Sequence, residues 1–118
     1  MRIALVGSFY STSQPSGEND VVQDQSLALS EAGHEVLLIR QDADELQGGL
    51  FVLKTGIDVV LGTGRDPTPV LRDFKPDIVH VDNLFPNLEV QWLSDWPGPI
   101  VVTLHNYRFF CSNGLLYR

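Results

Sequence analysis

Four short apolar runs divide the chain, and each is rich in valine, isoleucine or leucine. They span residues 3–6, 36–39, 78–81 and 100–104. Their apolar residues are largely consecutive rather than alternating with polar ones, which is typical of strands buried on both faces of a parallel sheet. The connections between the runs are too long for hairpins. The pattern therefore predicts an α/β fold, in which helices cover a parallel sheet of about four strands.

The first connection combines a polar loop, residues 8–18, with a predicted helix. Asn19 or Asp20 is expected to cap the N-terminus of this helix, and Gly33 is expected to end it in the left-handed conformation. The strand, loop, helix and second strand then form one unit, whose crossover should be right-handed. The apolar residues predicted to face the sheet are Val21, Val22, Ala28, Leu29 and Ala32.

The second connection is less regular. Apolar residues at intervals of three and four favour a helix over residues 50–61. Residues 57–61 are also compatible with a strand, and Gly56 weakens a helix there.

Two shorter helices are predicted before the third and fourth strands. Asp66-Pro67 fits an N-cap followed by a proline in the first turn, and Lys75-Pro76 ends that helix. The next helix is expected to begin at Pro86 and to stop before residues 97–99, which read Pro-Gly-Pro. The predicted buried residues are Val70, Leu71 and Phe74 in the first of these helices, and Val90, Leu93 and Trp96 in the second.

Composition narrows the classes of function. The 118 residues suit one domain, and a net charge of −7 disfavours nucleic acids and anionic membranes as partners. The single cysteine, Cys111, cannot form an intramolecular disulfide, which favours a cytoplasmic location. The sequence has neither a signal-type start nor a run of about 20 apolar residues, so membrane contact is expected to be peripheral at most.

The ends of the predicted strands carry the candidate chemistry. Ligands of open parallel sheets bind beyond the carboxyl ends of the strands. Three segments fall there: residues 7–17, 80–83 and 105–108, with His80 in the second and His105 in the third. His34 precedes a strand at the opposite edge and is interpreted as a turn residue beside Gly33.

The first loop lacks the common phosphate-binding fingerprints. Gly7 is not followed by a glycine two residues later, so the dinucleotide pattern Gly-x-Gly-x-x-Gly is missing, and there is no Gly-x-x-x-x-Gly-Lys run. Ser16-Gly17 comes just before the predicted helix. Two interpretations stay open: Gly17 lets backbone N–H groups approach an anion, or it only makes a turn.

Metal and thiol chemistry are both disfavoured. His80, Asp82 and His105 are residue types that bind metals, but no third ligand with a fixed spacing is visible, so no metal and no cofactor are predicted. Nothing near Cys111 suggests an activated thiolate, and it is interpreted as an apolar packing residue.

Several segments resemble a known enzyme family. Residues 1–6 (MRIALV), 15–19 (PSGEN), 33–36 (GHEV), 75–86 (KPDIVHVDNLFP) and 99–108 (PIVVTLHNYR), continued by residues 111–114, are similar to the N-terminal half of family-four retaining glycosyltransferases. The resemblance covers nearly the whole chain, and the two later motifs are its most specific part. It implies the two-domain GT-B fold, whose N-terminal Rossmann-like domain shapes the acceptor site.

The resemblance also implies roles for individual residues. His105 matches the family's active-site histidine, and Gly17 matches a loop glycine near the donor diphosphate. Many members carry two glycines where this chain has Ser16-Gly17, and a second histidine where it has Asp82. The other residues expected to line the cleft are Ser16, Glu18, Asn83, Asn106, Tyr107 and Arg108.

The expected activity is transfer of a sugar, with retention, from a nucleotide-sugar donor to a sugar, glycan or lipid acceptor. Residues 1–118 would form the incomplete N-terminal domain, inactive without a donor-binding domain. Phe109, Phe110, Leu115 and Leu116 would then lack their cover, so self-association is also expected. The alternative is a non-catalytic, flavodoxin-like binding or regulatory module.

Overall fold

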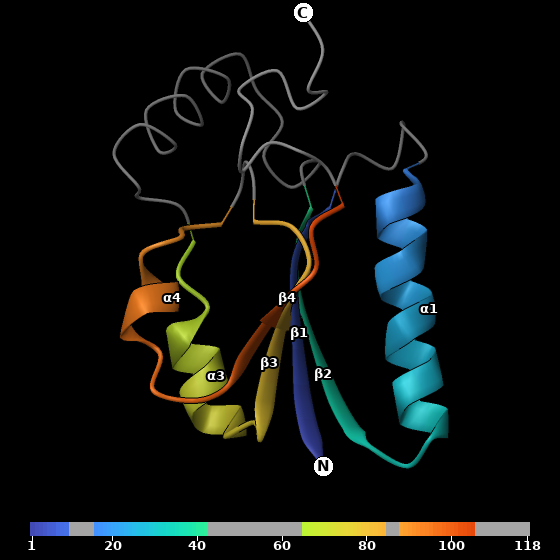
Figure 1. The fold of residues 1–118 in the computed structure, drawn as a ribbon, viewed down its shortest axis with the longest axis horizontal. Coiled ribbons are helices and arrows are strands. Elements are labelled where there is room, and N and C mark those ends of the chain that lie inside the picture. The colour runs from blue at the N-terminus through green and yellow to red at the C-terminus, as the bar shows by residue number, and fades with distance from the viewer. Residues whose placement is uncertain (10–15, 43–64, 85–87, 106–118) are drawn as a thin grey trace, which may run out of the picture.

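Each of the four apolar runs forms a strand in the computed structural model, which describes residues 1–9, 16–42, 65–84 and 88–105. The strands are β1 (Arg2–Phe9), β2 (Glu35–Asp42), β3 (Ile78–Val81) and β4 (Ile100–Val102). All pairings are parallel, in the order β2-β1-β3-β4 (Figure 1). The predicted α/β fold, a Rossmann-like parallel sheet with flanking helices, is therefore confirmed.

Helices cover both faces of this sheet. The helix α1 (Gly17–Glu31) lies along one face, and α3 (Thr68–Phe74) and α4 (Trp92–Asp95) lie on the other (Figure 1). The order of the strands explains this division. After β1 the chain moves outward to β2, and it later returns to place β3 on the other side of β1. Right-handed crossovers in opposite directions put their helices on opposite faces.

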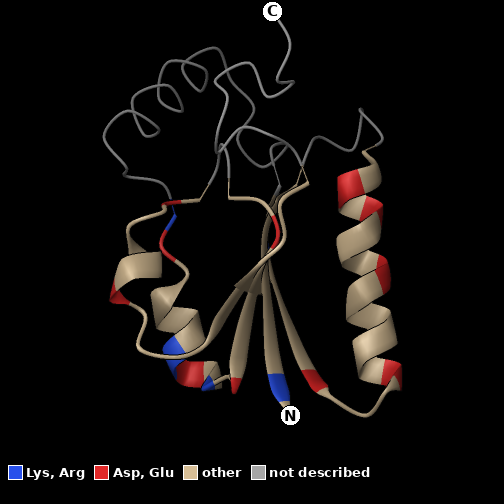
Figure 2. Cartoon of the chain, viewed as in Figure 1, with Lys and Arg blue, Asp and Glu red and all other residues tan. Residues whose placement is uncertain are grey.

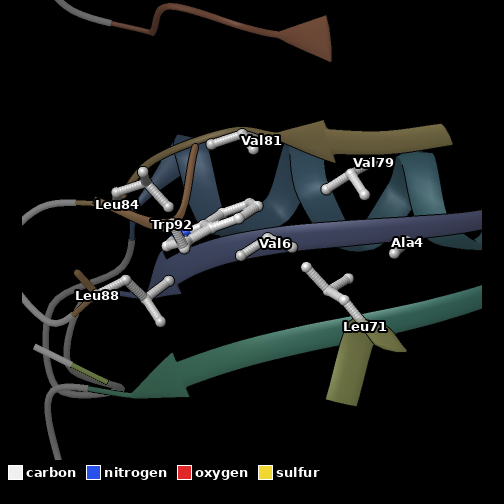
Figure 3. Packing of buried hydrophobic residues seen from close by; sticks show 8 residues of the cluster. All are labelled: Ala4, Val6, Leu71, Val79, Val81, Leu84, Leu88 and Trp92. Atoms are coloured by element: carbon white, nitrogen blue, oxygen red, sulfur yellow. The ribbon is translucent and has the colours of Figure 1, made fainter. Parts of the chain in front are cut away.

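The main apolar core lies between the sheet and the α3 and α4 helices (Figure 3). Register explains which strand residues enter it: Ala4 pairs with Val79 and Val6 pairs with Val81, so all four side chains point to the same face. The core cluster consists of Ala4, Val6, Leu71, Val79, Val81, Leu84, Leu88 and Trp92.

The helix α1 differs from its prediction at its start. It begins at Gly17, with Ser16 as N-cap and no side-chain capping bond, so the predicted caps Asn19 and Asp20 lie inside the first turn. Its end is as predicted, because the helix stops at Glu31 and Gly33 takes a positive φ of 88°.

The buried side of α1 was predicted only in part. Val22 is buried and Leu29 is half-buried, but Val21, Ala28 and Ala32 are exposed. The residues that face the sheet follow Val22 at intervals of three and four, and they include the polar Gln25 and Ser26. Val21 and Val22 are neighbours about 100° apart around the helix axis, so both cannot point to the sheet.

The shorter helices need similar corrections. Pro67 is the N-cap of α3, and Asp66 Oδ1 accepts a hydrogen bond from the N–H of Thr68 at 2.8 Å. Leu71 is buried and Phe74 half-buried, whereas Val70 is exposed. The helix ends at Lys75 as predicted.

The helix before β4 is shorter than expected. It begins at Trp92, which is buried, and the predicted start at Pro86 lies outside the described residues. Leu93 and Trp96 pack against the core, but Val90 is exposed. The helix predicted over residues 50–61 also lies outside the described residues.

Burial on both faces holds for β1 but not for the outer strands. β2 is half-buried, and Val101 and Val102 of β4 are exposed. β4 also ends two residues earlier than predicted, which leaves Leu104 beyond it and exposed. The reason is position, because β4 is an edge strand and β1 lies between two neighbours. Self-association through such an edge stays a prediction.

Within the described ranges, no helix has both the length and the apolar character needed to cross a membrane.

Candidate functional site

The sheet has a topological switch point between β1 and β3. Strand order reverses there, since the chain runs from β1 outward to β2 and then returns to the opposite side of β1. Open α/β sheets bind ligands at such a point, beyond the carboxyl ends of the two strands. The carboxyl end of β1, the residues that directly follow β3 and β4 (82–84 and 103–105) and the N-terminus of α1 all lie at this edge (Figure 1).

Alternation along β3 sends two polar side chains to the α1 face. Val79 and Val81 point into the apolar core, so His80 and Asp82 point the other way. Their shared direction agrees with the 3.8 Å separation of His80 Nε2 and Asp82 Oδ1.

Asp82 is the most buried charged residue of this edge, with a side chain only 1% exposed. Its backbone N–H donates to the carbonyl of Val6, which holds it against β1. Its Oδ1 accepts a hydrogen bond from His105 Nε2 at 3.0 Å, and its Oδ2 is buried with no hydrogen-bond partner among the described residues. In the described part of the chain, the basic side chains with a nitrogen within 4 Å of this carboxylate are both histidines.

His80 is tied at both ring nitrogens. Gln25 Nε2 of α1 lies 3.1 Å from His80 Nδ1, and His80 Nε2 lies 2.7 Å from Thr103 Oγ1. An amide nitrogen only donates, so Nδ1 accepts and Nε2 carries the proton that it donates to Thr103. His80 therefore links the middle of α1 to the end of β4.

Asn83, two residues after β3, connects this strand to β1 and α1. Its carbonyl accepts a hydrogen bond from the N–H of Ser8, and its Nδ2 donates to Glu18 Oε2 at 3.2 Å. Asn83 is buried and Glu18 is half-buried. Two of the predicted cleft residues, Glu18 and Asn83, are thus brought together at the switch point.

The N-terminus of α1 carries acidic rather than basic side chains. Glu18 and Asp20 are in the first turn, where the partial positive charge of the helix favours carboxylates (Figure 2). A Cβ at Gly17 would meet no atom within 4 Å, and Gly17 has no positive φ. The structure thus gives Gly17 no conformational role, and neighbouring Ser16 is half-buried at the N-cap.

His105 follows β4 by three residues, and its side chain is 13% exposed. Its bond to Asp82 brings together the ends of β3 and β4, which are paired up to Val81 and Val102. The predicted cleft residues Asn106, Tyr107 and Arg108 lie outside the described residues, as does Cys111. His34 lies at the opposite edge of the sheet, beside Gly33, as predicted.

Sequence reasoning missed two members of this site, Gln25 and Thr103. It also treated Asp82 as a doubtful metal ligand rather than as the partner of His105. The register offered a signal: Val81 pairs with Val102, so Asp82 and Thr103 are the next pair along two parallel strands. Gln25 gave a weaker signal, a polar residue three positions after Val22 on the sheet-facing side of α1.

The arrangement favours hydrogen-bond and proton-transfer chemistry. A carboxylate only accepts hydrogen bonds, so His105 Nε2 carries the proton and Nδ1 carries the lone pair. In the described ranges, no three histidine, cysteine, aspartate or glutamate side chains are grouped so that they could hold a metal ion.

Comparisons with protein-family models, with curated proteins and with solved structures found no match to this chain. The site itself and the sequence motifs are therefore the basis for inferring function.

Proposed function

We propose that this chain forms the acceptor side of a glycosyltransferase that moves a sugar, with retention, from a nucleotide-sugar to a hydroxyl acceptor. The observation that carries the proposal is the pair formed by His105 and the buried Asp82 at the carboxyl edge of the sheet. His105 is the residue that the family resemblance independently marks as the active-site histidine.

The chemistry of the pair suits sugar transfer. The transition state is a positively charged, oxocarbenium-like sugar with a departing diphosphate, and fixed polar groups stabilise such charges best where water is kept out. A buried carboxylate beside an imidazole supplies a fixed negative charge near the acceptor. Glu18 and Asn83 add further polar groups that suit recognition of sugar hydroxyls.

The donor is expected to be bound mainly by a second domain, as the resemblance implies. The acidic first turn of α1 supports placing the acceptor rather than most of the diphosphate at this end of the helix. The Gly17 backbone remains the proposed contact to the diphosphate, and Ser16, Asn106, Tyr107 and Arg108 are proposed to line the cleft. Neither a metal nor a cofactor is part of the proposal, and the single cysteine supports a cytoplasmic location.

The test is turnover by the protein expressed at the full length of its gene, with a panel of nucleotide-sugars and hydroxyl acceptors. His105→Ala should lower kcat by about 10²-fold or more, the scale for losing one positioned catalytic group. The matched control is His34→Ala, the same change at the opposite edge of the sheet, which should leave kcat within about twofold. Release of nucleoside diphosphate and transfer of labelled sugar are measured together.

The results that would contradict the proposal are specific. If His105→Ala folds and keeps near-normal turnover, His105 has no catalytic part. Retention itself is checked by the anomeric configuration of the product in NMR, and an inverted product would contradict that part alone.

A non-catalytic binding module is the second candidate, because the order β2-β1-β3-β4 is also that of flavodoxin-like sheets. A receiver domain is disfavoured within this class, since acidic residues would be expected directly after β1, where Gly7-Ser8-Phe9 stands. Saturable ligand binding that is weakened by His105→Ala, with no turnover of any donor, would favour this candidate.

A further inference from the structure

Two histidines lie beside one buried carboxylate, and the structure distinguishes them. Both ring nitrogens of His80 are engaged, one by Gln25 and one by Thr103. His105 has one bond, from Nε2 to Asp82, and among the described residues no partner contacts its Nδ1. His105 is therefore the member of the pair with a nitrogen free to act on a ligand.

The bond to Asp82 decides the protonation pattern of His105. Because the carboxylate only accepts, it stabilises the tautomer with the proton on Nε2 and leaves the lone pair on Nδ1. When Nδ1 takes up a proton, the resulting imidazolium lies 3.0 Å from a carboxylate that is shielded from water. Opposite charges attract more strongly in such a buried site than at an exposed surface.

The burial of Asp82 is costly unless a partner compensates for it. A charged carboxylate removed from water is normally paired or fully hydrogen-bonded, yet within the described ranges Oδ2 of Asp82 has no partner. His80 Nε2 is 3.8 Å away and already donates to Thr103. The charge of Asp82 is therefore directed mainly at His105.

We propose that Asp82 is the positioning residue that makes His105 a general base for the acceptor hydroxyl. This inference rests on the proposed glycosyltransferase function. The acceptor O–H bond breaks and its proton goes to Nδ1 of His105, while the acceptor oxygen forms a bond to the anomeric carbon. The acceptor attacks from the face that the donor phosphate leaves, so the configuration is retained. The bond between that carbon and the donor phosphate oxygen breaks, and its electron pair leaves with the nucleoside diphosphate. The imidazolium then returns its proton to solvent.

The first experiment measures the protonation pattern of the rings and begins with the wild type. Nitrogen-15 NMR of the wild-type imidazole rings should show His105 as the Nε2–H tautomer when neutral. Asp82→Asn should shift this ring toward a mixture of tautomers, because an amide both donates and accepts. The control is Asp77→Asn, at the opposite edge, where an exposed carboxylate accepts from the Arg2 N–H at 2.7 Å; it should leave the His105 signals unchanged.

The second experiment is kinetic. Asp82→Asn should lower kcat of the full-length protein by about 10²-fold or more with KM changed less than about threefold, because proton transfer occurs only in the transition state. A merely structural role for Asp82 would instead raise KM or lower the melting temperature, with kcat per folded molecule preserved. Asp77→Asn should match the wild type in both constants.

The outcomes separate this inference from the proposed function. Wild-type His105 with its proton on Nδ1 overturns the positioning role whatever the activity, even if Asp82→Asn fails to fold. An unchanged kcat in folded Asp82→Asn overturns the general base and leaves sugar transfer intact. The expected tautomer with no transfer from any donor contradicts the proposed function, and the proton transfer with it.

Discussion

The two faces of the sheet are built from the same strands but differ in kind. Toward α3 and α4, the strands contribute Ala4, Val6, Val79 and Val81 to a core that is apolar throughout (Figure 3). Toward α1, His80 of β3 and Asp82, the residue directly after this strand, bond to side chains of α1 and of the segment that follows β4. Residues 79–82 thus serve stability through their odd-numbered positions and chemistry through their even-numbered ones.

This difference shows how a short strand can present site residues on one face while packing of the other face holds it in the sheet. The apolar face binds β3 to the core whatever occupies the other face. Burial of polar groups on the α1 face is tolerated because nearly all of them have hydrogen-bond partners. Among the described residues of this face, the exception is Asp82 Oδ2, which lies at the carboxyl edge of the sheet.

The largest expected effect tests the apolar face. Trp92→Ala should lower the free energy of unfolding by about 3–5 kcal/mol, because it removes a large buried side chain and leaves a cavity. In the part of the chain that the structure describes, its Nε1 has no hydrogen-bond partner, so the loss is one of packing alone. The measurement is urea unfolding followed by circular dichroism.

Val90→Ala is the control for that change, since Val90 is exposed two residues earlier and should cost less than about 0.5 kcal/mol. Equal losses at Trp92 and Val90 would show that the α4 side does not form the core.

The intermediate effect tests the polar face. His80→Ala removes two neutral hydrogen bonds at a half-buried position, each contributing about 0.5–1.5 kcal/mol, and should cost about 1–3 kcal/mol in total. The loss should be smaller than that of Trp92→Ala, because water can enter and satisfy the freed groups.

A double-mutant cycle with Gln25→Ala isolates the bond between α1 and β3. The two changes together should cost less than the sum of the single changes by about 0.5–1 kcal/mol. Strict additivity would mean that the bond between Gln25 and His80 contributes nothing to stability.

The sequence predicts the apolar face better than the polar one, and the reason is physical. Consecutive valines and isoleucines mark a buried strand directly, so β1 and β3 are found with their centres correct. Helix faces are found from apolar spacing, which succeeds for Leu71 but misses the sheet-facing side of α1, where Gln25 takes an apolar position.

The candidate site is predictable in position but not in connectivity. His105 follows a strand, and the strand ends mark the ligand edge without any knowledge of side-chain contacts. The pairing of His105 with Asp82 depends on the order and register of β3 and β4, and no local sequence pattern predicts either of these. The polar bonds of His80 likewise join residues 55 and 23 positions apart in the chain.

The smallest expected effect compares the ends of the helices on the two faces. Behind α1, the left-handed position is taken by Gly33, with a φ of 88°; at the end of α3 it is taken by Lys75, with a φ of 51°. A side chain with a Cβ is disfavoured there by about 1 kcal/mol or more, and glycine is not. Lys75→Gly should therefore raise the free energy of unfolding by about 0.5–1 kcal/mol, reduced from the full strain because glycine also makes the unfolded chain more flexible. Gly33→Ala is the reverse change and should lower the free energy of unfolding by about 1 kcal/mol. Because a Cβ at Gly33 would contact no atom within 4 Å, this variant tests the backbone conformation alone. Urea midpoints of the two variants should move in opposite directions, and a stabilising Gly33→Ala or a destabilising Lys75→Gly would show that backbone strain does not govern where these helices end.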